Sequence, residues 1–117
     1  NRFPFWFAKN YQKYAGHEEE MPFDQHFLVA LMAPRLVYTS TKTNDSWADP
    51  ASEFESLVQA SPVYGLFGLK GLDQPEPPLP ESPLHEGCMG HHRKTGDHDM
   101  DEYDWNQYMN FADKHMV

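Results

Sequence analysis

Two polar segments of this sequence carry side chains that could perform acid–base chemistry. A β-branched and aromatic run at residues 36–39 gives way to a polar loop at residues 44–50, which contains Asp45, and His98 lies far downstream in a glycine turn. A carboxylate that orients an imidazole allows the ring to take a proton from a nucleophile, as in a Ser-His-Asp triad. The order acid, then histidine predicts the second and third members of such a triad.

The same residues have ordinary structural interpretations. Asp45 belongs to an Asn-Asp-Ser sequence that is typical of a turn, and His98 could be a surface histidine. Asp49 competes as the acid, although Asp49 before Pro50 is typical of a helix start. Trp47 could offer its ring to a sugar, or it could pack in the core.

Metal chemistry and a cysteine nucleophile are weaker interpretations. The segment 88–102 is rich in the ligand types of zinc sites, namely Cys88, His91, His92, Asp97, His98, Asp99, Asp101 and Glu102. However, the chain has a single cysteine and no His-Glu-x-x-His motif. Adjacent histidines on a strand would also point to opposite faces. Nothing in the sequence around Cys88 favours a reactive thiolate paired with His98. We therefore predict no metal site and no cofactor.

No serine of this chain is a candidate nucleophile. A Gly-x-Ser-x-Gly elbow places the serine on a strained strand-to-helix turn. None of the six serines has such flanking glycines: Ser40, Ser46, Ser52, Ser56, Ser61 and Ser82.

Alternating helices and strands must position these groups. We expect a partly helical segment at residues 3–15, helices over 25–32 and 50–61 and from about residue 101, and strands over 36–39 and 88–94. Asp24 is the expected cap of the first of these three helices. The expected apolar faces are Phe7, Tyr11 and Tyr14; Phe27, Leu28, Leu31 and Met32; Ala51, Phe54, Leu57 and Val58; and Trp105, Tyr108, Met109, Ala112 and Met116. This alternation indicates an α/β fold whose two strands are parallel and covered on both faces.

Composition narrows the function classes. The 117 residues allow at most one domain, and a loop with five of the 10 prolines at residues 69–87 is long for a compact fold. A net charge of −9 argues against nucleic acid and against an anionic membrane surface. Two strands are too few for a complete doubly wound sheet, and the chain opens on an apolar segment. We therefore expect a piece of a larger αβα sandwich.

Several ordered stretches resemble the C-terminal part of bacterial glucuronoyl esterases, which are serine esterases of the α/β-hydrolase superfamily. They cover nearly the whole chain in the expected order, and together they are fairly specific. The stretches are FPFWFAKN at 3–10, MPFDQH at 21–26, APRLVY at 33–38, WADP at 47–50, ASPVY at 60–64, TGDHD at 95–99 and YDW at 103–105.

This resemblance implies specific roles. His98 matches the catalytic histidine of the family, Asp45 matches the acid that many bacterial members place after the seventh strand, and Trp47 matches a tryptophan that contacts the glucuronoyl sugar. The serine, in a Gly-Cys-Ser-Arg-x-Gly-Lys turn, would lie upstream of Asn1. Some members instead use a glutamate after the sixth strand as the acid. Asp97 and His91 depart from the glycine and the tyrosine common at their positions.

The resemblance also implies a substrate and a location. The expected substrate is an ester of (4-O-methyl-)glucuronic acid in lignin–carbohydrate complexes of glucuronoxylan, the expected location is secreted or periplasmic, and the expected partner is the remainder of the same hydrolase domain. Residues 1–117 would be the C-terminal portion of that domain. Two alternatives stay open: another α/β-hydrolase, such as a different carbohydrate esterase or a peptidase, and a noncatalytic or metal-binding module.

Overall fold

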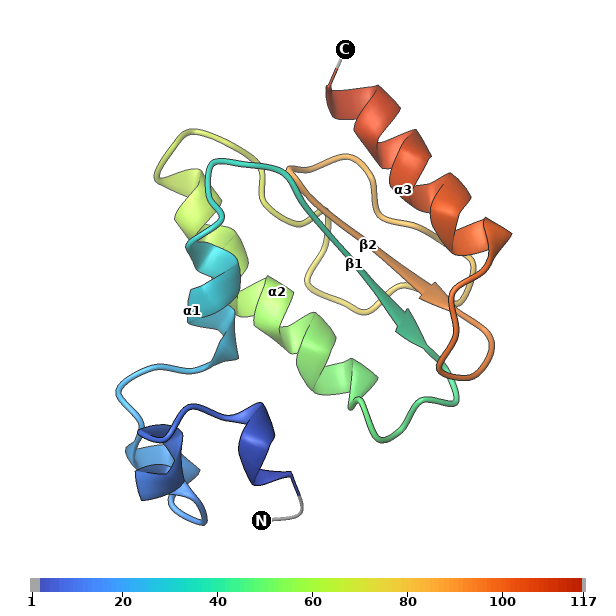
Figure 1. Cartoon of the computed structure of the whole chain (residues 1–117). Coiled ribbons are helices and arrows are strands. Elements are labelled where there is room, and N and C mark those ends of the chain that lie inside the picture. Colours follow the sequence, from blue (N-terminus) through green and yellow to red (C-terminus); the bar gives the residue numbers. More distant parts are fainter. Residues whose placement is uncertain (1–2, 117) are drawn as a thin grey trace.

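Two parallel strands lie between helices on either face (Figure 1). The computed structural model describes residues 3–116. The elements are three 3₁₀ turns, η1 (Pro4–Trp6), η2 (Tyr11–Tyr14) and η3 (Glu18–Glu20), followed by α1 (Gln25–Ala30), β1 (Val37–Lys42), α2 (Pro50–Gly65), β2 (Met89–Lys94) and α3 (Glu102–His115). In Figure 1, α1 and α2 lie on one side of the strand pair and α3 on the other. The predicted α/β class, with two parallel strands and flanking helices, is confirmed.

The register of the two strands aligns their carboxyl ends. Val37 pairs with Met89 at one end, and Lys42 pairs with Lys94 at the other. Strand β1 starts one residue later than predicted and continues beyond the predicted end through Lys42. Strand β2 also starts one residue later than predicted, and it ends at the predicted residue, Lys94. The loops that follow β1 and β2 therefore leave the same edge of the sheet side by side, as parallel strands require.

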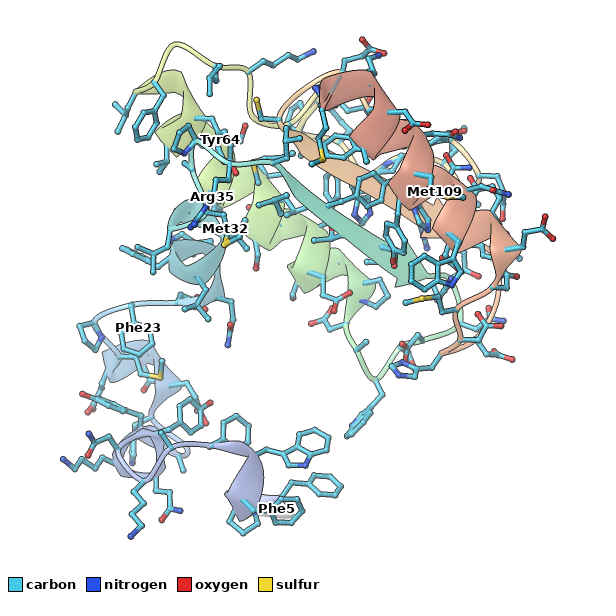
Figure 2. All side chains as sticks on the ribbon, turned by 45° about the horizontal axis from the view of Figure 1, so that its top comes forward. Phe5, Phe23, Met32, Arg35, Tyr64 and Met109 are labelled. Carbon is cyan, nitrogen blue, oxygen red and sulfur yellow. The ribbon has the colours of Figure 1, made fainter. Side chains whose placement is uncertain are left out.

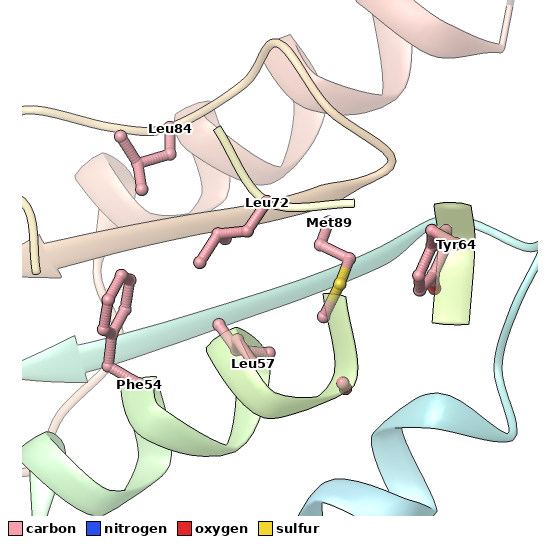
Figure 3. Packing of buried hydrophobic residues seen from close by; sticks show 7 residues of the cluster. Phe54, Leu57, Tyr64, Leu72, Leu84 and Met89 are labelled. Atoms are coloured by element: carbon pink, nitrogen blue, oxygen red, sulfur yellow. The ribbon is translucent and has the colours of Figure 1, made fainter. Parts of the chain in front are cut away.

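The hydrophobic core lies between α2 and the sheet (Figure 3). Its buried members come from α2, from β2 and from the long loop: Phe54, Leu57, Ala60, Tyr64, Leu72, Leu84 and Met89. Burial of each large aliphatic or aromatic side chain contributes about 1.5–3 kcal/mol. This cluster fixes α2, and with it the loop that precedes α2, against β1.

Helix α2 begins as predicted and ends later. Asp49 caps it, because its carboxylate accepts from the backbone N–H of Ser52, and Pro50 occupies the first turn. The predicted end near residue 61 is wrong, since the helix passes through Pro62 to Gly65. The buried ring of Tyr64 explains the extension, because its hydroxyl donates to the Arg35 carbonyl at 2.8 Å. Figure 2 shows these two residues close together.

Helix α1 is shorter than predicted and turns its apolar stripe outward. Asp24 caps it as expected, by accepting from the backbone N–H of Gln25. Val29, Ala30 and Ala33 pack against the core. The four residues of the predicted apolar face are exposed: Phe27, Leu28, Leu31 and Met32. The expectation that this face is covered is therefore wrong for residues 3–116.

Helix α3 starts with the predicted acids, but it packs through a different face. Asp101 and Asp104 form a capping box. The buried residues are Asp104 and Phe111, whereas Trp105, Met109 and Met116 of the predicted face are exposed (Figure 2 labels Met109). The hydrophobic pattern of the sequence predicted the wrong packed face, because the charged side chain of Asp104 faces the sheet.

The long loop between α2 and β2 covers the outer edge of β2. It contains no helix or strand, but Leu84 and His91 exchange backbone hydrogen bonds at 2.7 and 3.1 Å in an antiparallel bridge. Glu81 N–H donates to the Arg93 carbonyl at 2.8 Å. The other edge of β1 has no partner strand within residues 3–116.

The N-terminal segment forms short 3₁₀ turns instead of a regular helix. Phe7 stacks on Tyr11 with ring centroids 4.5 Å apart, so part of the predicted aromatic face does assemble. Pro4 and Gly16 fall within this segment, and Gly16 adopts a positive φ of 82°.

No helix in residues 3–116 combines the length and the apolar character needed to span a bilayer.

Candidate active site

The loops after β1 and β2 are bound to each other along their first residues. Thr43 N–H donates to the Lys94 carbonyl at 2.9 Å, and Asn44 N–H donates to the Gly96 carbonyl at 3.0 Å. Gly96 N–H in turn donates to the Thr43 hydroxyl at 3.1 Å. Gly96 has a φ of 143°, which disfavours any side chain at this point. These bonds extend the strand register into the loops that carry Asp45 and His98.

Asp45 and His98 meet at the end of this paired segment. Nδ1 of His98 lies 2.6 Å from Oδ2 of Asp45, within the range expected for an acid that orients an imidazole. The Asp45 side chain is 13% exposed and the His98 side chain 86% exposed. Within residues 3–116 the structure shows no partner for Nε2 of His98, the ring nitrogen opposite the one that meets the acid.

Asp45 also controls the charge of the ring. The hydrogen bond to Asp45, and then its negative charge, raise the pKa of His98 above the ordinary 6.5, and Glu53 and Asp99 add smaller contributions in the same direction. Burial and the charges of Asp45 and Asp49 raise the pKa of Glu53, which follows in the first turn of α2. A protonated His98 is therefore stabilised, as an imidazolium formed during proton transfer must be.

Asp49, the competing acid, is occupied elsewhere. Its carboxylate accepts from the Ser52 hydroxyl at 2.7 Å and from the Ser52 backbone N–H at 3.3 Å. The hydroxyl bond lowers the pKa of Asp49. Of the two aspartates, the structure brings Asp45 to His98 and gives Asp49 to the helix cap.

Trp47 lies outside the core. Its side chain is 73% exposed, and its ring centroid lies 5.9 Å from that of Trp6 and 6.1 Å from that of Phe3. An open hollow of about 350 Å³ is lined by the N-terminal aromatics and Trp47, namely Phe3, Pro4, Trp6, Phe7, Tyr11, Gln12 and Trp47. Trp47 is therefore available to a ligand, while its contact with a sugar stays a prediction.

The residues of the competing chemistries do not converge on His98. Cys88 precedes β2 and His98 follows it, so roughly 20 Å of strand separates them at about 3.3 Å per residue. His91 packs against Phe54 on the α2 side, whereas His92 hydrogen-bonds Asp104 on the α3 side. A Cys88–His98 pair and a zinc site at the two histidines therefore lack the necessary geometry.

Ligand types do gather at one exposed position. His17, Glu19 and Glu20 offer atoms within 4.8 Å of one another on the turn around η3. These residues lie outside the segment 88–102 that the sequence singled out, and solvent surrounds all three.

Four of the serines hold structural hydrogen bonds: Ser40 to Tyr108, Ser52 to Asp49, Ser56 to the Ser52 carbonyl, and Ser61 to Leu72 N–H.

Sequence reasoning missed a polar network beneath the site. The buried Asp104 accepts from Lys42 and from Nε2 of His92, the latter at 2.8 Å. Burial raises the pKa of Asp104, but the hydrogen bonds from Lys42, from the Asp101 backbone and from His92 outweigh that effect and leave it well below its usual range. The signal available in the sequence was the pair of acids, Asp101 and Asp104, at the start of the last helix.

The network assigns tautomers to its histidines. Because His92 donates from Nε2 to the Asp104 carboxylate, its Nδ1 must accept from the Tyr38 hydroxyl, which lies 3.0 Å away. The Tyr38 oxygen then accepts from Nε2 of His85 at 2.9 Å. Burial lowers the pKa of His92 and raises the pKa of Tyr38, so both stay neutral. This side of the sheet is held by a hydrogen-bonded network that includes charged groups, whereas the α2 side is held mainly by the hydrophobic cluster.

Comparisons with known proteins match this architecture. A sequence profile described as "Glucuronyl esterase, fungi" matches residues 2–68. Carbohydrate esterase MZ0003, from an unknown prokaryotic organism, is 42% identical over 98% of this chain and 26% of its own length. The solved structure of a glucuronoyl esterase from Solibacter usitatus superposes with a TM-score of 0.88 and 47% identity, over 96% of this chain and 28% of that one.

A fungal relative matches a smaller part of the chain. The 4-O-methyl-glucuronoyl methylesterase 1 of Phanerochaete chrysosporium is 31% identical over 55% of this chain and 14% of its own length. The chain thus spans about a quarter of the prokaryotic relatives and less of the fungal one. The family profile covers more than half of the chain, and the solved structure shares its fold. By these matches the chain belongs to the glucuronyl esterase family.

Proposed function

We propose that the complete protein is a serine esterase that hydrolyses esters of (4-O-methyl-)glucuronic acid, and that residues 1–117 are the C-terminal portion of its α/β-hydrolase domain. The observation that carries this proposal is the contact between Asp45 and His98 at 2.6 Å. Family membership supplies the substrate class. Lignin–carbohydrate esters of glucuronoxylan are the natural substrates in this proposal, and a secreted or periplasmic location suits such polymers.

The proposed reaction passes through an acyl-enzyme. Nε2 of His98 takes the proton of a serine hydroxyl, supplied by the remainder of the domain, as the serine oxygen attacks the ester carbonyl. Nδ1–H of His98 donates to Asp45 throughout, which stabilises the imidazolium. Collapse of the tetrahedral intermediate breaks the bond to the alcohol, which leaves with the proton from Nε2. Water then attacks the acyl-enzyme and gives a proton to Nε2 of His98. Cleavage of the bond to the serine oxygen returns that proton to the serine and releases the free glucuronic acid.

The proposed role of Trp47 is to hold the sugar. Its exposed ring, on the loop that also carries Asp45, can cover one face of a pyranose. Such a contact persists from the ground state to the transition state. Its loss would then weaken binding more than it slows the chemical step.

The experiment compares two variants of the complete domain on the methyl ester of glucuronic acid. His98→Ala is expected to lower kcat by roughly 10⁴–10⁶, because a triad base acts in the transition state. Trp47→Ala is expected mainly to raise KM. Circular dichroism controls for folding. A folded His98→Ala variant with near-normal turnover, or a wild type that cleaves acetyl esters or peptides but no glucuronate ester, would contradict the proposal.

A further inference from the structure

The aspartate that follows His98 is held by a lysine from each strand. We propose that Asp99, clamped by Lys42 and Lys94, is a positioning residue that fixes the turn carrying His98 and so keeps the imidazole on Asp45. This inference rests on the proposed function for its catalytic meaning, but its structural content concerns only residues of this chain.

The clamp joins the carboxyl ends of both strands. Nζ of Lys42 lies 3.8 Å from Oδ1 of Asp99, and Nζ of Lys94 lies 3.9 Å from the same oxygen. Lys42 and Lys94 are register partners at the ends of β1 and β2. A single carboxylate oxygen therefore connects the loop after β2 to the last residue of each strand.

Both lysines are anchored from behind by the start of α3. Lys42 is 6% exposed and pairs with the buried carboxylate of Asp104, and Lys94 is 15% exposed and pairs with Asp101. Burying a cation is costly unless anions compensate its charge. The two ammonium groups thus have fixed places, and the Asp99 side chain, which is itself 56% exposed, forms a long ion pair with each of them.

The neighbouring aspartate provides an internal contrast. Asp97 stands on the other side of His98 and makes no ion pair within residues 3–116, whereas Asp99 makes two. The Asp99 backbone N–H donates to the Asp97 carbonyl at 2.8 Å, so both residues belong to the same tight turn. Both aspartates are immediate neighbours of His98 in the sequence, but only Asp99 forms ion pairs with the strands.

The charges around His98 allow two effects of the lysines to be distinguished: positioning of the turn that carries His98, and the direct effect of a lysine charge on the His98 pKa. The groups facing the ring are Asp45 from the β1 loop, Glu53 from α2 and Asp99 from its own loop, with Lys42 and Lys94 behind Asp99. Removal of a lysine charge alone would raise the pKa of His98, since a nearby cation disfavours the imidazolium. Loosening of the turn would weaken the bond to Asp45 and lower that pKa. The two explanations predict shifts of opposite sign.

The test follows the His98 ring by NMR in the complete domain. Two readouts are recorded: the pH titration of the ring and the low-field resonance of Nδ1–H that a short bond to a carboxylate produces. Asp99→Asn is expected to broaden the Nδ1–H signal, and this is its informative readout, because loss of the Asp99 charge lowers the His98 pKa in either case. Asp97→Asn should retain the signal. Lys94→Met should lower the pKa despite the lost cation, and Lys94→Arg should restore it.

The outcomes are decisive in either direction. A retained Nδ1–H signal in Asp99→Asn, or a rise of the His98 pKa in Lys94→Met, would overturn the clamp. In the complete domain, Asp99→Asn is expected to lower kcat/KM by about 10–100-fold, as small misplacements of catalytic groups do, with Asp97→Asn close to wild type. If His98→Ala leaves activity intact, the proposed function fails, whatever the NMR shows. If His98→Ala abolishes activity but Asp99→Asn behaves like Asp97→Asn, the inference about Asp99 fails and the proposed function stands.

Discussion

His98 contacts Asp45 through Nδ1, which leaves Nε2 for the proposed reaction. This division defines the tautomer, because the neutral ring must carry its proton on Nδ1 to donate to Asp45. An asparagine at position 45 could donate from its amide to Nδ1, and this would move the ring proton to Nε2. The base would then have no lone pair to offer the nucleophile.

We therefore predict a large difference between two aspartates of the same loop. In the complete domain, Asp45→Asn should lower kcat by about 10⁴, as the wrong tautomer does in a serine protease triad. Asp49→Asn should leave kcat unchanged, because asparagine caps helices equally well and tolerates the φ of 55° at this position. Steady-state kinetics at one pH suffices. Equal losses in the two variants would mean that the acid is misassigned.

The same contact predicts a pH dependence. His98 must be neutral to act as a base, and its pKa is raised above 6.5, chiefly by the hydrogen bond to Asp45. The value of kcat/KM should rise with pH through this raised pKa. The stabilisation of the fold by the charged pair has the opposite dependence: it is fully present below pH 6.5 and is lost as pH rises through the raised pKa.

The pH profile is checked by kcat/KM measurements across the neutral range, with thermal melts at the same pH values. The Asp45→Asn variant should move the profile toward lower pH, since both the bond and the charge are gone. A profile that does not respond to this substitution would assign the titration to another group.

At the scale of elements, the two faces of the sheet use different physics. The α2 face holds the apolar cluster together with the neutral polar side chains of His91, Thr39 and Thr41. The α3 face instead contains the charged pair of Asp104 and Lys42, with His92, beside the ring of Phe111. Gly90 allows α3 to approach, because a Cβ there would lie 2.8 Å from a Phe111 ring carbon and closer still to the ring of Tyr38.

Gly90→Ala should consequently destabilise the fold by about 1–3 kcal/mol, the usual cost of overpacking. Gly65→Ala is the matched control, since a Cβ there meets nothing within 4 Å and Gly65 does not have a positive φ. Urea denaturation of both variants measures the difference. A Gly90→Ala variant as stable as Gly65→Ala would show that α3 does not pack on the sheet in this way.

The elements differ in how well the sequence predicted them. Strand β1, the caps Asp24 and Asp49 and the start of α3 were predictable, because a β-branched run, capping aspartates and paired acids are local signals. The packed face of α3 was not, since its orientation depends on a lysine 62 residues away in the chain. Pro62 was misleading for a similar reason, as the contact of Tyr64 with Arg35 lies beyond any local window.

The site shows the same division. The order of Asp45 and His98, together with the resemblance, was enough to predict their contact. The clamp on Asp99 was not predictable, because no pattern of spacing says which acid of the segment 97–104 meets which lysine. That choice follows from strand register, which only the folded chain defines.

For the whole molecule, the chain covers about a quarter of its prokaryotic relatives and leaves apolar surface open. The stripe on α1, the ring of Phe5 and the unpaired edge of β1 all face outward (Figure 2 labels Phe5 and Met32). A patch of this kind usually marks a protein–protein contact. The remainder of the hydrolase domain is the partner that we propose for it.

The isolated chain should accordingly be inactive. We expect no turnover of a methyl glucuronate ester by the 117 residues alone, because no serine within residues 3–116 contacts His98. The complete domain, assayed in parallel, is the positive control. Turnover by the chain that is abolished in Ser46→Ala or Cys88→Ala would identify an unexpected nucleophile and contradict the proposed division of the triad.

The backbone bonds between the two catalytic loops have a practical consequence for engineering. Since Asp45 and His98 are aligned by neighbouring strands of one contiguous segment, a cut made ahead of that segment leaves the acid–histidine pair intact on one piece and the nucleophile on the other. On the proposed function, neither piece alone would turn over substrate. The proposed esterase could thus be divided at this point into a two-part reporter whose activity would measure the association of its two pieces.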